Sequence, residues 1–229
     1  MDVDLPQPWP TTADEAIAMQ DRLRAKVILD DDAPAELRLA AGLDVAYAPG
    51  SDHAAAAVVV LDAESGEIVD SSTAYTQVDF PYVSGLFAFR EVPPLVAALR
   101  GLTTVPDLLV CDGYGLAHPR RFGLACHLGV LTGLPSIGVG KTAFIGDYPE
   151  VGPDRGEWGP LTDRGEVIGR VLRTRTGVKP VFVSVGHRIS LDRASAQVLR
   201  LCRQYRLPET VRAADHLCRD VLKTRIASA

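Results

Sequence analysis

Two short apolar runs separated by one helical segment constrain the fold of this chain most strongly. The runs are "PDLLVCDG" at residues 106–113 and "LPSIGV" at residues 134–139, and the segment between them predicts a helix over about 121–131. Such runs are typical of strands buried on both faces of a parallel sheet. A strand, a helix and a second parallel strand in this order form a right-handed βαβ unit. We therefore expect an α/β fold with helices on the faces of its sheet.

The segments on either side of this unit predict further strands and helices. Thr12 and Glu15 form a capping-box pattern ahead of a helix over 13–28, and Pro93 and Pro94 interrupt a helical segment that ends near Arg100. An antiparallel meander is predicted over 37–48, 54–63 and 68–78, a hairpin over 167–173 and 181–185, and two helices over 191–205 and 209–224. We expect a mixed sheet of about five strands, flanked by helices.

Length and composition indicate a soluble, cytoplasmic, single-domain protein. A chain of 229 residues is long enough for one sizeable core and short for two, so we expect one domain over residues 1–229. The N-terminus, "MDVDLPQPWP", lacks the basic start and apolar run of a secretion signal, and no apolar stretch is long enough to span a bilayer. The four cysteines show no zinc-binding spacing, and we expect them to be reduced thiols in the core.

Charge is distributed unevenly along the chain. The net charge is −5, with many acidic residues before residue 80, whereas ten arginine and lysine residues between Arg164 and Arg206 face only Glu166 and Asp192. The net charge argues against indiscriminate binding of nucleic acid. The basic segment is equally consistent with a solvated face and with a surface that binds a polyanion.

The stretch "IGVGKT" at residues 137–142 ends like a nucleotide-binding phosphate loop, but it lacks the parts that define one. The loop needs a glycine five residues before Gly140, where this chain has Pro135. Proline has a fixed φ and no backbone N–H, and the residues after Thr142 contain too many glycines and prolines for the required helix. We therefore expect no nucleotide cofactor. Lys141 follows a predicted parallel strand, so it is either a ligand-binding residue or an exposed loop lysine.

Two aspartates interrupt strands that are otherwise apolar. Asp44 lies within "LAAGLDVAYA", and Asp112 ends the buried run "LLVC". A buried carboxylate must be paired, hydrogen-bonded or bound to a cation. If the two strands are neighbours, the carboxylates converge, and oxygen ligands of this kind favour Mg²⁺ or Mn²⁺. Glu91 and Asp215 are further candidates; each residue alone also fits a turn, a salt bridge or a helix surface.

Six segments, in order, resemble the endonuclease V family over residues 36–220, downstream of an N-terminal helix and linker at 1–35. They are "GLDVAY", "DFPYVSGLFAFRE", "VCDGYGLAHPRRFGLACHLGV", "PSIGVGK", "GHRISLDRA" and "LPETVRAADHL". The resemblance implies a ribonuclease H-like fold, with three antiparallel strands followed by parallel ones. It also implies a DNA repair enzyme that hydrolyses the second phosphodiester bond 3′ to deoxyinosine and leaves 3′-hydroxyl and 5′-phosphate ends.

The resemblance also implies a set of active-site residues. Asp44, Glu91 and Asp112 match the family's metal-binding carboxylates, with Mg²⁺ as the expected ion and Mn²⁺ as a substitute. Asp215 matches a late acidic or histidine ligand, and Lys141 matches a lysine beside the scissile phosphate. The basic segment is then expected to contact the DNA backbone.

Substrate-binding residues are implied in the same way. Pro81, Tyr82, Val83 and Ser84 match a wedge that fills the gap left by a flipped base, with Ser84 where the family usually has proline. Gly85 and Gly113 suit close approach of the base. Arg120 is expected to bind substrate, and His118 and His127 match histidines near the active centre, with a structural role as the alternative for each histidine.

Two other functions fit the sequence. One is an endonuclease of the same fold that prefers inosine-containing RNA, which only the contacts to a ribose 2′-hydroxyl would distinguish. The other is a protein that binds lesions without cutting, which would not need a buried acid cluster. We expect a monomer that acts on DNA without a membrane partner.

Overall fold

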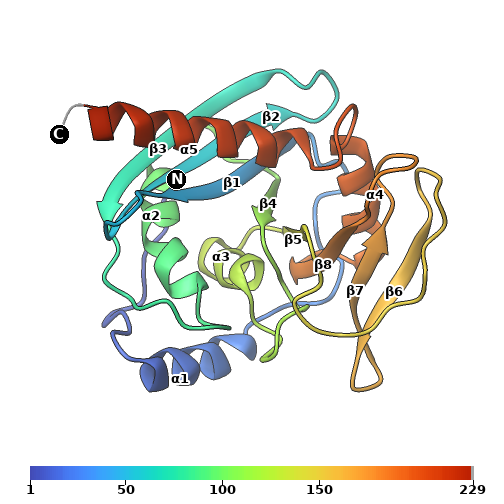
Figure 1. Cartoon of the computed structure of the whole chain (residues 1–229), viewed down its shortest axis with the longest axis horizontal. Coiled ribbons are helices and arrows are strands. Elements are labelled where there is room, and N and C mark those ends of the chain that lie inside the picture. The colour runs from blue at the N-terminus through green and yellow to red at the C-terminus, as the bar shows by residue number, and fades with distance from the viewer. Residues whose placement is uncertain (228–229) are drawn as a thin grey trace.

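A computed structural model of the chain describes residues 1–227. It contains five α-helices and eight strands (Figure 1). In chain order these are α1 (Ala13–Arg24), β1 (Leu39–Tyr47), β2 (His53–Asp62), β3 (Ile68–Gln77), α2 (Ala88–Arg100), β4 (Leu108–Asp112), α3 (Leu124–Thr132), β5 (Ser136–Gly140), β6 (Trp158–Asp163), β7 (Glu166–Leu172), β8 (Val181–His187), α4 (Leu191–Leu201) and α5 (Glu209–Ala227).

The eight strands form one mixed sheet in the order β3-β2-β1-β4-β5-β8-β7-β6. The first three strands form the predicted antiparallel meander. β4 and β5 then add to β1 in parallel, as the βαβ pattern predicted. The expected α/β fold is thus confirmed, but the estimate of about five strands was too low. The hairpin β7–β8 continues the same sheet through antiparallel pairing of β8 with β5, and β6 adds an edge.

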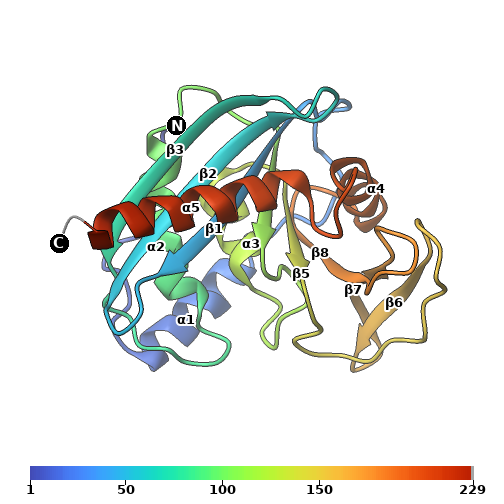
Figure 2. The same cartoon turned by 45° about the horizontal axis from the view of Figure 1, so that its top comes forward.

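Helices cover both faces of the sheet (Figures 1 and 2). On one face, α5 packs across β1 and β2, and α4 packs on β7 and β8. On the other face, α2 and α3 pack on the alternate residues of β1, β2 and β4. Because both faces are covered, the interior strand β2 is apolar almost throughout, and its residues 54–61 are buried. All four cysteines lie buried as free thiols, as expected.

Two helices show how local sequence and packing combine. The Thr12–Glu15 capping box is present, since each side chain accepts from the other residue's backbone N–H. α2 runs through Pro93 and Pro94, although Pro93 cannot donate to the carbonyl of Phe89. The indole Nε1 of Trp9 donates to that carbonyl instead, at 3.3 Å. The N-terminal segment therefore replaces the hydrogen bond that the proline removes.

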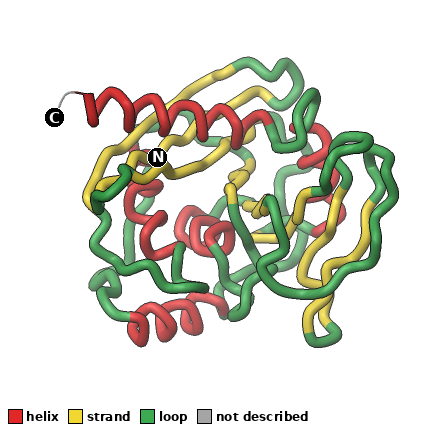
Figure 3. The backbone as a smooth tube through the Cα atoms, viewed as in Figure 1, coloured by secondary structure: helices red, strands yellow, loops and turns green. Residues whose placement is uncertain are grey.

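Loops connect these elements at the lower edge of the sheet in Figure 3, between α1, α3 and the β6–β7 hairpin. The segments after β4 and β5 lie there, together with the loop that precedes α2. No helix among residues 1–227 is long and apolar enough to cross a membrane.

Candidate active site

Adjacent ends of β1 and β4 bring Asp44 and Asp112 together. The two strands are parallel, and Leu43 lies opposite Cys111 in their register. The next residue of each strand, Asp44 and Asp112, is therefore also side by side. Both side chains are half-buried and line one cavity of about 440 Å³. The two strands are therefore neighbours, and their carboxylates converge as the sequence analysis expected for that case.

Glu91 adds a third carboxylate from the first turn of α2 and lines the same cavity. It is only 8% exposed, and burial, together with the charges of Asp44 and Asp112, raises its pKa well above the usual range. Burial and the charge of Asp112 raise the pKa of Asp44 to about 7. Three carboxylates in one partly buried cavity repel one another, so a bound cation would stabilise their charged forms.

Lys141 supplies one positive charge to this cluster. It follows β5 directly, and its Nζ donates to Asp112 Oδ2 at 2.5 Å. Burial alone would lower the pKa of Lys141, but the hydrogen bond to Asp112 and the nearby acids raise it overall. Lys141 is therefore charged and is placed beside the acids, rather than free in solvent as an ordinary loop lysine.

The donor set suits a hard divalent cation, because carboxylate oxygens are the ligands that Mg²⁺ and Mn²⁺ prefer. Asp44 accepts one hydrogen bond, from the backbone N–H of Val45, and no cationic side chain pairs with Asp44 or Glu91 in residues 1–227. The same residues contain no three His, Cys, Asp or Glu side chains already arranged to hold an ion. The carboxylates thus fit a divalent metal by their chemistry.

Asp215 lies near this cluster without lining the cavity. It is on α5, and its charge contributes to the raised pKa of Asp44. Its carboxylate accepts from Arg219 Nε at 2.7 Å, one turn further along the helix. Asp215 is therefore close enough to act on Asp44 and Lys141 through its charge, and it is paired with an arginine.

The loop before α2 presents Tyr82 to solvent. Tyr82 is 78% exposed and makes an edge contact with Phe87, with 5.4 Å between ring centroids. Phe87 in turn packs on Tyr47, which is also in contact with the guanidinium of Arg90. Tyr82 is thus a protruding aromatic on an aromatic support. Pro81 and Ser84 beside it are exposed, and Val83 and Ser84 line the cavity.

A hydrogen-bond network fixes Gly85 at the end of this loop. Gly85 has a φ of +77°, a conformation that favours glycine. Its carbonyl accepts from Gln20 Nε2 at 3.1 Å, from Arg120 Nη2 at 2.7 Å and from His118 Nε2 at 3.0 Å. Gln20 is fully buried, and its Oε1 accepts from Arg120 Nε at 2.5 Å. Arg120, half-buried, therefore holds the loop in place, where the sequence had predicted a residue that binds substrate.

The hydrogen bonds of His118 define its protonation state. Its Nδ1 accepts from the backbone N–H of Arg120 at 3.2 Å, so Nε2 carries the proton that is donated to Gly85. Burial and the charge of Arg120 lower the pKa of His118 to about 4. His118 is therefore neutral near pH 7 and lines the cavity as a hydrogen-bond donor.

His127 lies outside the cavity, and its predicted contact with substrate is wrong. It is fully buried on α3 and packs against Trp9, Phe89 and Phe122, with ring centroids 5.0 to 5.7 Å apart. Neither ring nitrogen has a hydrogen-bond partner among residues 1–227, and burial lowers the pKa of His127 to about 3. His127 is thus an apolar-like core residue, the structural alternative that the sequence had left open.

Two aromatic residues that the sequence analysis did not single out shape the loop that carries Lys141. The ring of Tyr114 stacks on Phe144 at 5.3 Å, and its hydroxyl donates to the carbonyl of Thr142 at 3.0 Å. Both rings line the cavity, as does Gly113. A Cβ on Gly140 would lie 2.6 Å from Tyr114 Cε1, so the glycine leaves room for this ring.

The basic segment between Arg164 and Arg206 is largely committed to internal contacts. Arg170, Arg188 and Arg193 pair with aspartates, and most of the other arginines of the segment donate to backbone carbonyls. These bonds hold loops against the core. Many of these cations thus serve the fold, and contact of the segment with the DNA backbone stays a prediction.

Comparison with known proteins identifies the family. The family model described as Endonuclease V matches residues 21–216. The chain is 54% identical to the endonuclease V of Streptomyces avermitilis over 226 residues, which is 98% of this chain and 99% of that protein. The chain belongs to the endonuclease V family. It is thus a nuclease, as the resemblance implied.

Solved endonuclease V structures share this architecture. The crystal structure of the Streptomyces avermitilis protein aligns over 100% of both chains with a TM-score of 0.93. The catalytic domain of human endonuclease V, 34% identical, aligns over 97% of this chain and 99% of that one with a TM-score of 0.87. The Ciona intestinalis enzyme, 30% identical, aligns over 92% of this chain and 98% of that one with a TM-score of 0.80; it was solved with a 24mer DNA containing an inosine followed by a ribo-adenosine.

Proposed function

We propose that this endonuclease V is a metal-dependent repair enzyme that acts on deoxyinosine in DNA. It would hydrolyse the second phosphodiester bond 3′ to the lesion and leave 3′-hydroxyl and 5′-phosphate ends. The observation that carries the proposal is one cavity that combines three mutually repelling carboxylates, a charged lysine and a protruding tyrosine. The inosine-containing DNA bound by the Ciona intestinalis relative supports the choice of lesion.

Asp44, Glu91 and Asp112 would hold Mg²⁺, with Mn²⁺ as a substitute, and Asp215 would serve as a fourth metal-binding carboxylate beside Asp44. When bound, the ion supplies a more acidic water and stabilises negative charge on the phosphate. Lys141 would move its ammonium from Asp112 toward a phosphoryl oxygen and offset the charge that develops there.

The other side chains of the cavity would recognise the base. Tyr82 would enter the stack and fill the gap that the flipped base leaves. The base would then lie against the backbone of Gly85 and Gly113, which have no side chains. His118 is neutral and donates to Gly85, so its role would be to hold this wall in place rather than to take a proton from water.

The test is cleavage of an inosine-containing duplex by the purified protein with Mg²⁺. Asp44→Ala and Asp112→Ala should bind the duplex without nicking it. Asp220→Ala removes an exposed acid from α5 and should nick normally. Undiminished nicking by either of the first two variants would refute the proposed ligand set.

Inosine-containing RNA is the second candidate substrate, because the DNA bound by the Ciona intestinalis relative carries a ribonucleotide directly after the inosine. Matched DNA and RNA strands should be cut side by side, each with Mg²⁺ and with Mn²⁺. Faster cleavage of the DNA strand supports the leading proposal. Faster cleavage of the RNA strand replaces it with the alternative.

A further inference from the structure

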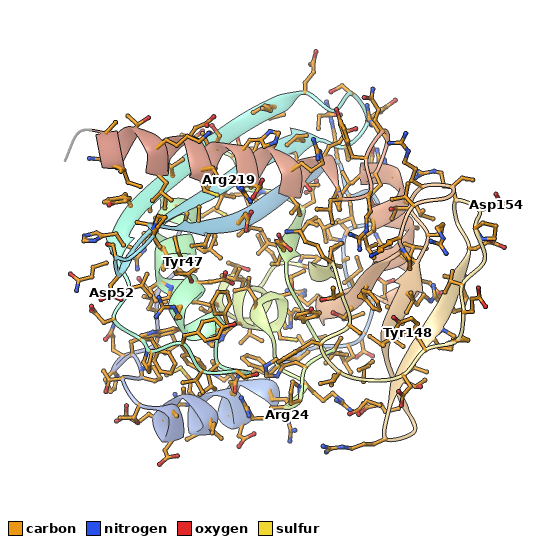
Figure 4. All side chains as sticks on the ribbon, viewed as in Figure 1. Arg24, Tyr47, Asp52, Tyr148, Asp154 and Arg219 are labelled. Atoms are coloured by element: carbon orange, nitrogen blue, oxygen red, sulfur yellow. The ribbon has the colours of Figure 1, made fainter. Side chains whose placement is uncertain are left out.

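A second hollow opens beside the catalytic cavity. It has a volume of about 430 Å³ and shares only Lys141 and Thr142 with the catalytic cavity. Its wall comes mainly from the loop after β5 and from β8 with the segments around it, on the side of the molecule that carries β6 and β7 (Figure 4). We call it the exit groove. A nucleic-acid strand with a phosphate beside Lys141 would therefore pass next to this groove.

The exit groove is strongly positive for a protein with a net charge of −5. Besides Lys141, it is lined by Arg173, Lys179 and Arg206, against one acid, Glu150. None of these three cations makes an ion pair within residues 1–227, unlike the aspartate-paired arginines of the same segment. All three nitrogens of Arg173 donate to backbone carbonyls, whereas within residues 1–227 Arg206 donates through Nη2 alone, so Lys179 and Arg206 are the cations best able to meet a ligand.

Arg206 connects the groove to the catalytic lysine. Its Nη2 donates to the carbonyl of Lys141 at 2.5 Å and to the carbonyl of Pro180 at 2.8 Å. Its Nε is buried without a hydrogen-bond partner in the described part of the chain, and burial lowers the pKa of the guanidinium. Removing a cation from water without a counter-ion raises the free energy of the folded protein, and an anion bound in the groove would offset this increase. Lys179 is exposed on the same wall and adds a second cation.

Tyr148 adds an aromatic surface to the groove. It is 48% exposed, and its ring makes an edge contact with the buried Phe182, with 5.2 Å between centroids. An exposed ring beside unpaired cations is the combination with which proteins bind single strands, since phosphates meet the cations and bases stack on the ring. A phosphate alone would need the cations but not the tyrosine.

We propose that the exit groove binds the cleaved strand on the 3′ side of the cut, with Lys179 and Arg206 on its phosphates and Tyr148 against a base. The direction rests on the proposed function: the lesion occupies the catalytic cavity and the cut lies 3′ to it. The strand that leaves past Lys141 is therefore the segment that begins with the new 5′-phosphate.

Binding of a plain single-stranded oligonucleotide, without inosine, tests the groove independently of cleavage. Lys179→Ala should make the slope of log affinity against log salt concentration shallower by about 0.7, the value for one phosphate contact on a single strand. Lys223→Ala removes an equally exposed lysine at the far end of α5 and should leave the slope unchanged. Equal slopes for Lys179→Ala and the wild-type protein would overturn the proposal.

Cleavage then tests whether the groove binds the strand on the 3′ side of the cut. Inosine-containing strands with one or with six nucleotides beyond the cut are compared, and the wild-type protein should prefer the longer strand in kcat/KM. Tyr148→Ala should reduce this preference by roughly 5- to 150-fold, the range for one stacked base, and Tyr148→Phe should restore it. A length dependence on the 5′ side alone would overturn the assignment. Absence of any inosine-dependent cleavage would instead refute the proposed function, while the salt slopes still decide whether the groove binds a strand.

Discussion

Gly140→Ala is predicted to be damaging, although it adds a single methyl group. The backbone at this position does not need glycine, because its φ lies outside the left-handed region. The obstacle is Tyr114: the new Cβ would lie 2.6 Å from Cε1 and 3.1 Å from Cζ of the ring, where real Cβ atoms essentially never come closer than 3.0 Å. The ring must therefore move, and it cannot move without losing its contacts.

The contacts that the Tyr114 ring would lose determine how far Gly140→Ala lowers the stability of the protein. The hydrogen bond from Tyr114 to the carbonyl of Thr142 contributes about 0.5–1.5 kcal/mol, and the stacking on Phe144 about the same. Their loss predicts a cost of about 1–3 kcal/mol, which agrees with the usual cost of overpacking. Because Thr142 follows Lys141, the lysine loses its fixed position as well. If the whole cost falls on the transition state, kcat/KM falls by roughly 5- to 150-fold.

The assay is a double-mutant cycle with Tyr114→Ala, read by urea unfolding and by kcat/KM on an inosine-containing duplex. In the Tyr114→Ala background the new methyl group has space, so Gly140→Ala should cost less than about 0.5 kcal/mol. The reasoning is refuted if Gly140→Ala is harmless in the wild-type background, or if it costs the same in both.

Three further predictions follow from the same structure. The Glu91→Gln variant should not nick the duplex. Without metal it should unfold at the same or a higher temperature than the wild-type protein, because burial disfavours the charge that the substitution removes. Mg²⁺ should raise its melting temperature less than that of the wild-type protein, and an equal rise would exclude Glu91 from the metal ligands. Tyr82→Ala should lose affinity for inosine-containing duplex while its Mg²⁺ response stays normal, and wild-type affinity and selectivity would exclude the wedge role. His127 has a pKa of about 3, against an ordinary 6.5, so only the unfolded chain binds its proton as pH falls from 6.5 toward 3, and stability drops over that window. His127→Leu should therefore lose roughly 2 kcal/mol less than the wild-type protein between pH 7 and pH 5 in urea unfolding, and identical pH dependence would contradict this.

The parts of the site that could be predicted lie on neighbouring buried strands, Asp44 within β1 and Asp112 at the end of β4. Asp44 and Asp112 were identifiable because a charge in an apolar strand needs a partner, and parallel neighbours bring strand ends together. β6 was missed because it is a half-exposed edge strand that contains Pro160, so it lacks the apolar pattern of the others. α1 ends at Arg24 rather than near 28, since the residues beyond it turn away from the helix.

Residues that act through distant contacts could not be predicted. Gln20 and Arg120 are separated by 100 residues, and Gln20 and Gly85 by 65, so no local pattern links them. Tyr114 gains its role from the loop 28 residues later, through Thr142. His127 was misassigned because a histidine inside a matched motif looks the same whether it faces a cavity or a core.

The hydrogen bond from Gln20 to Gly85 ties α1 to the loop that carries Tyr82, although α1 carries no residue of the catalytic cavity. Gln20 also lies one residue ahead of the region by which the family is recognised, 21–216. Displacing α1 would remove this hydrogen bond to the Tyr82 loop, and it would also open the core cluster that α1 shares with Phe89, two residues before Glu91. A fusion or binding partner that displaces α1 would therefore disturb the Tyr82 loop and the surroundings of Glu91 together.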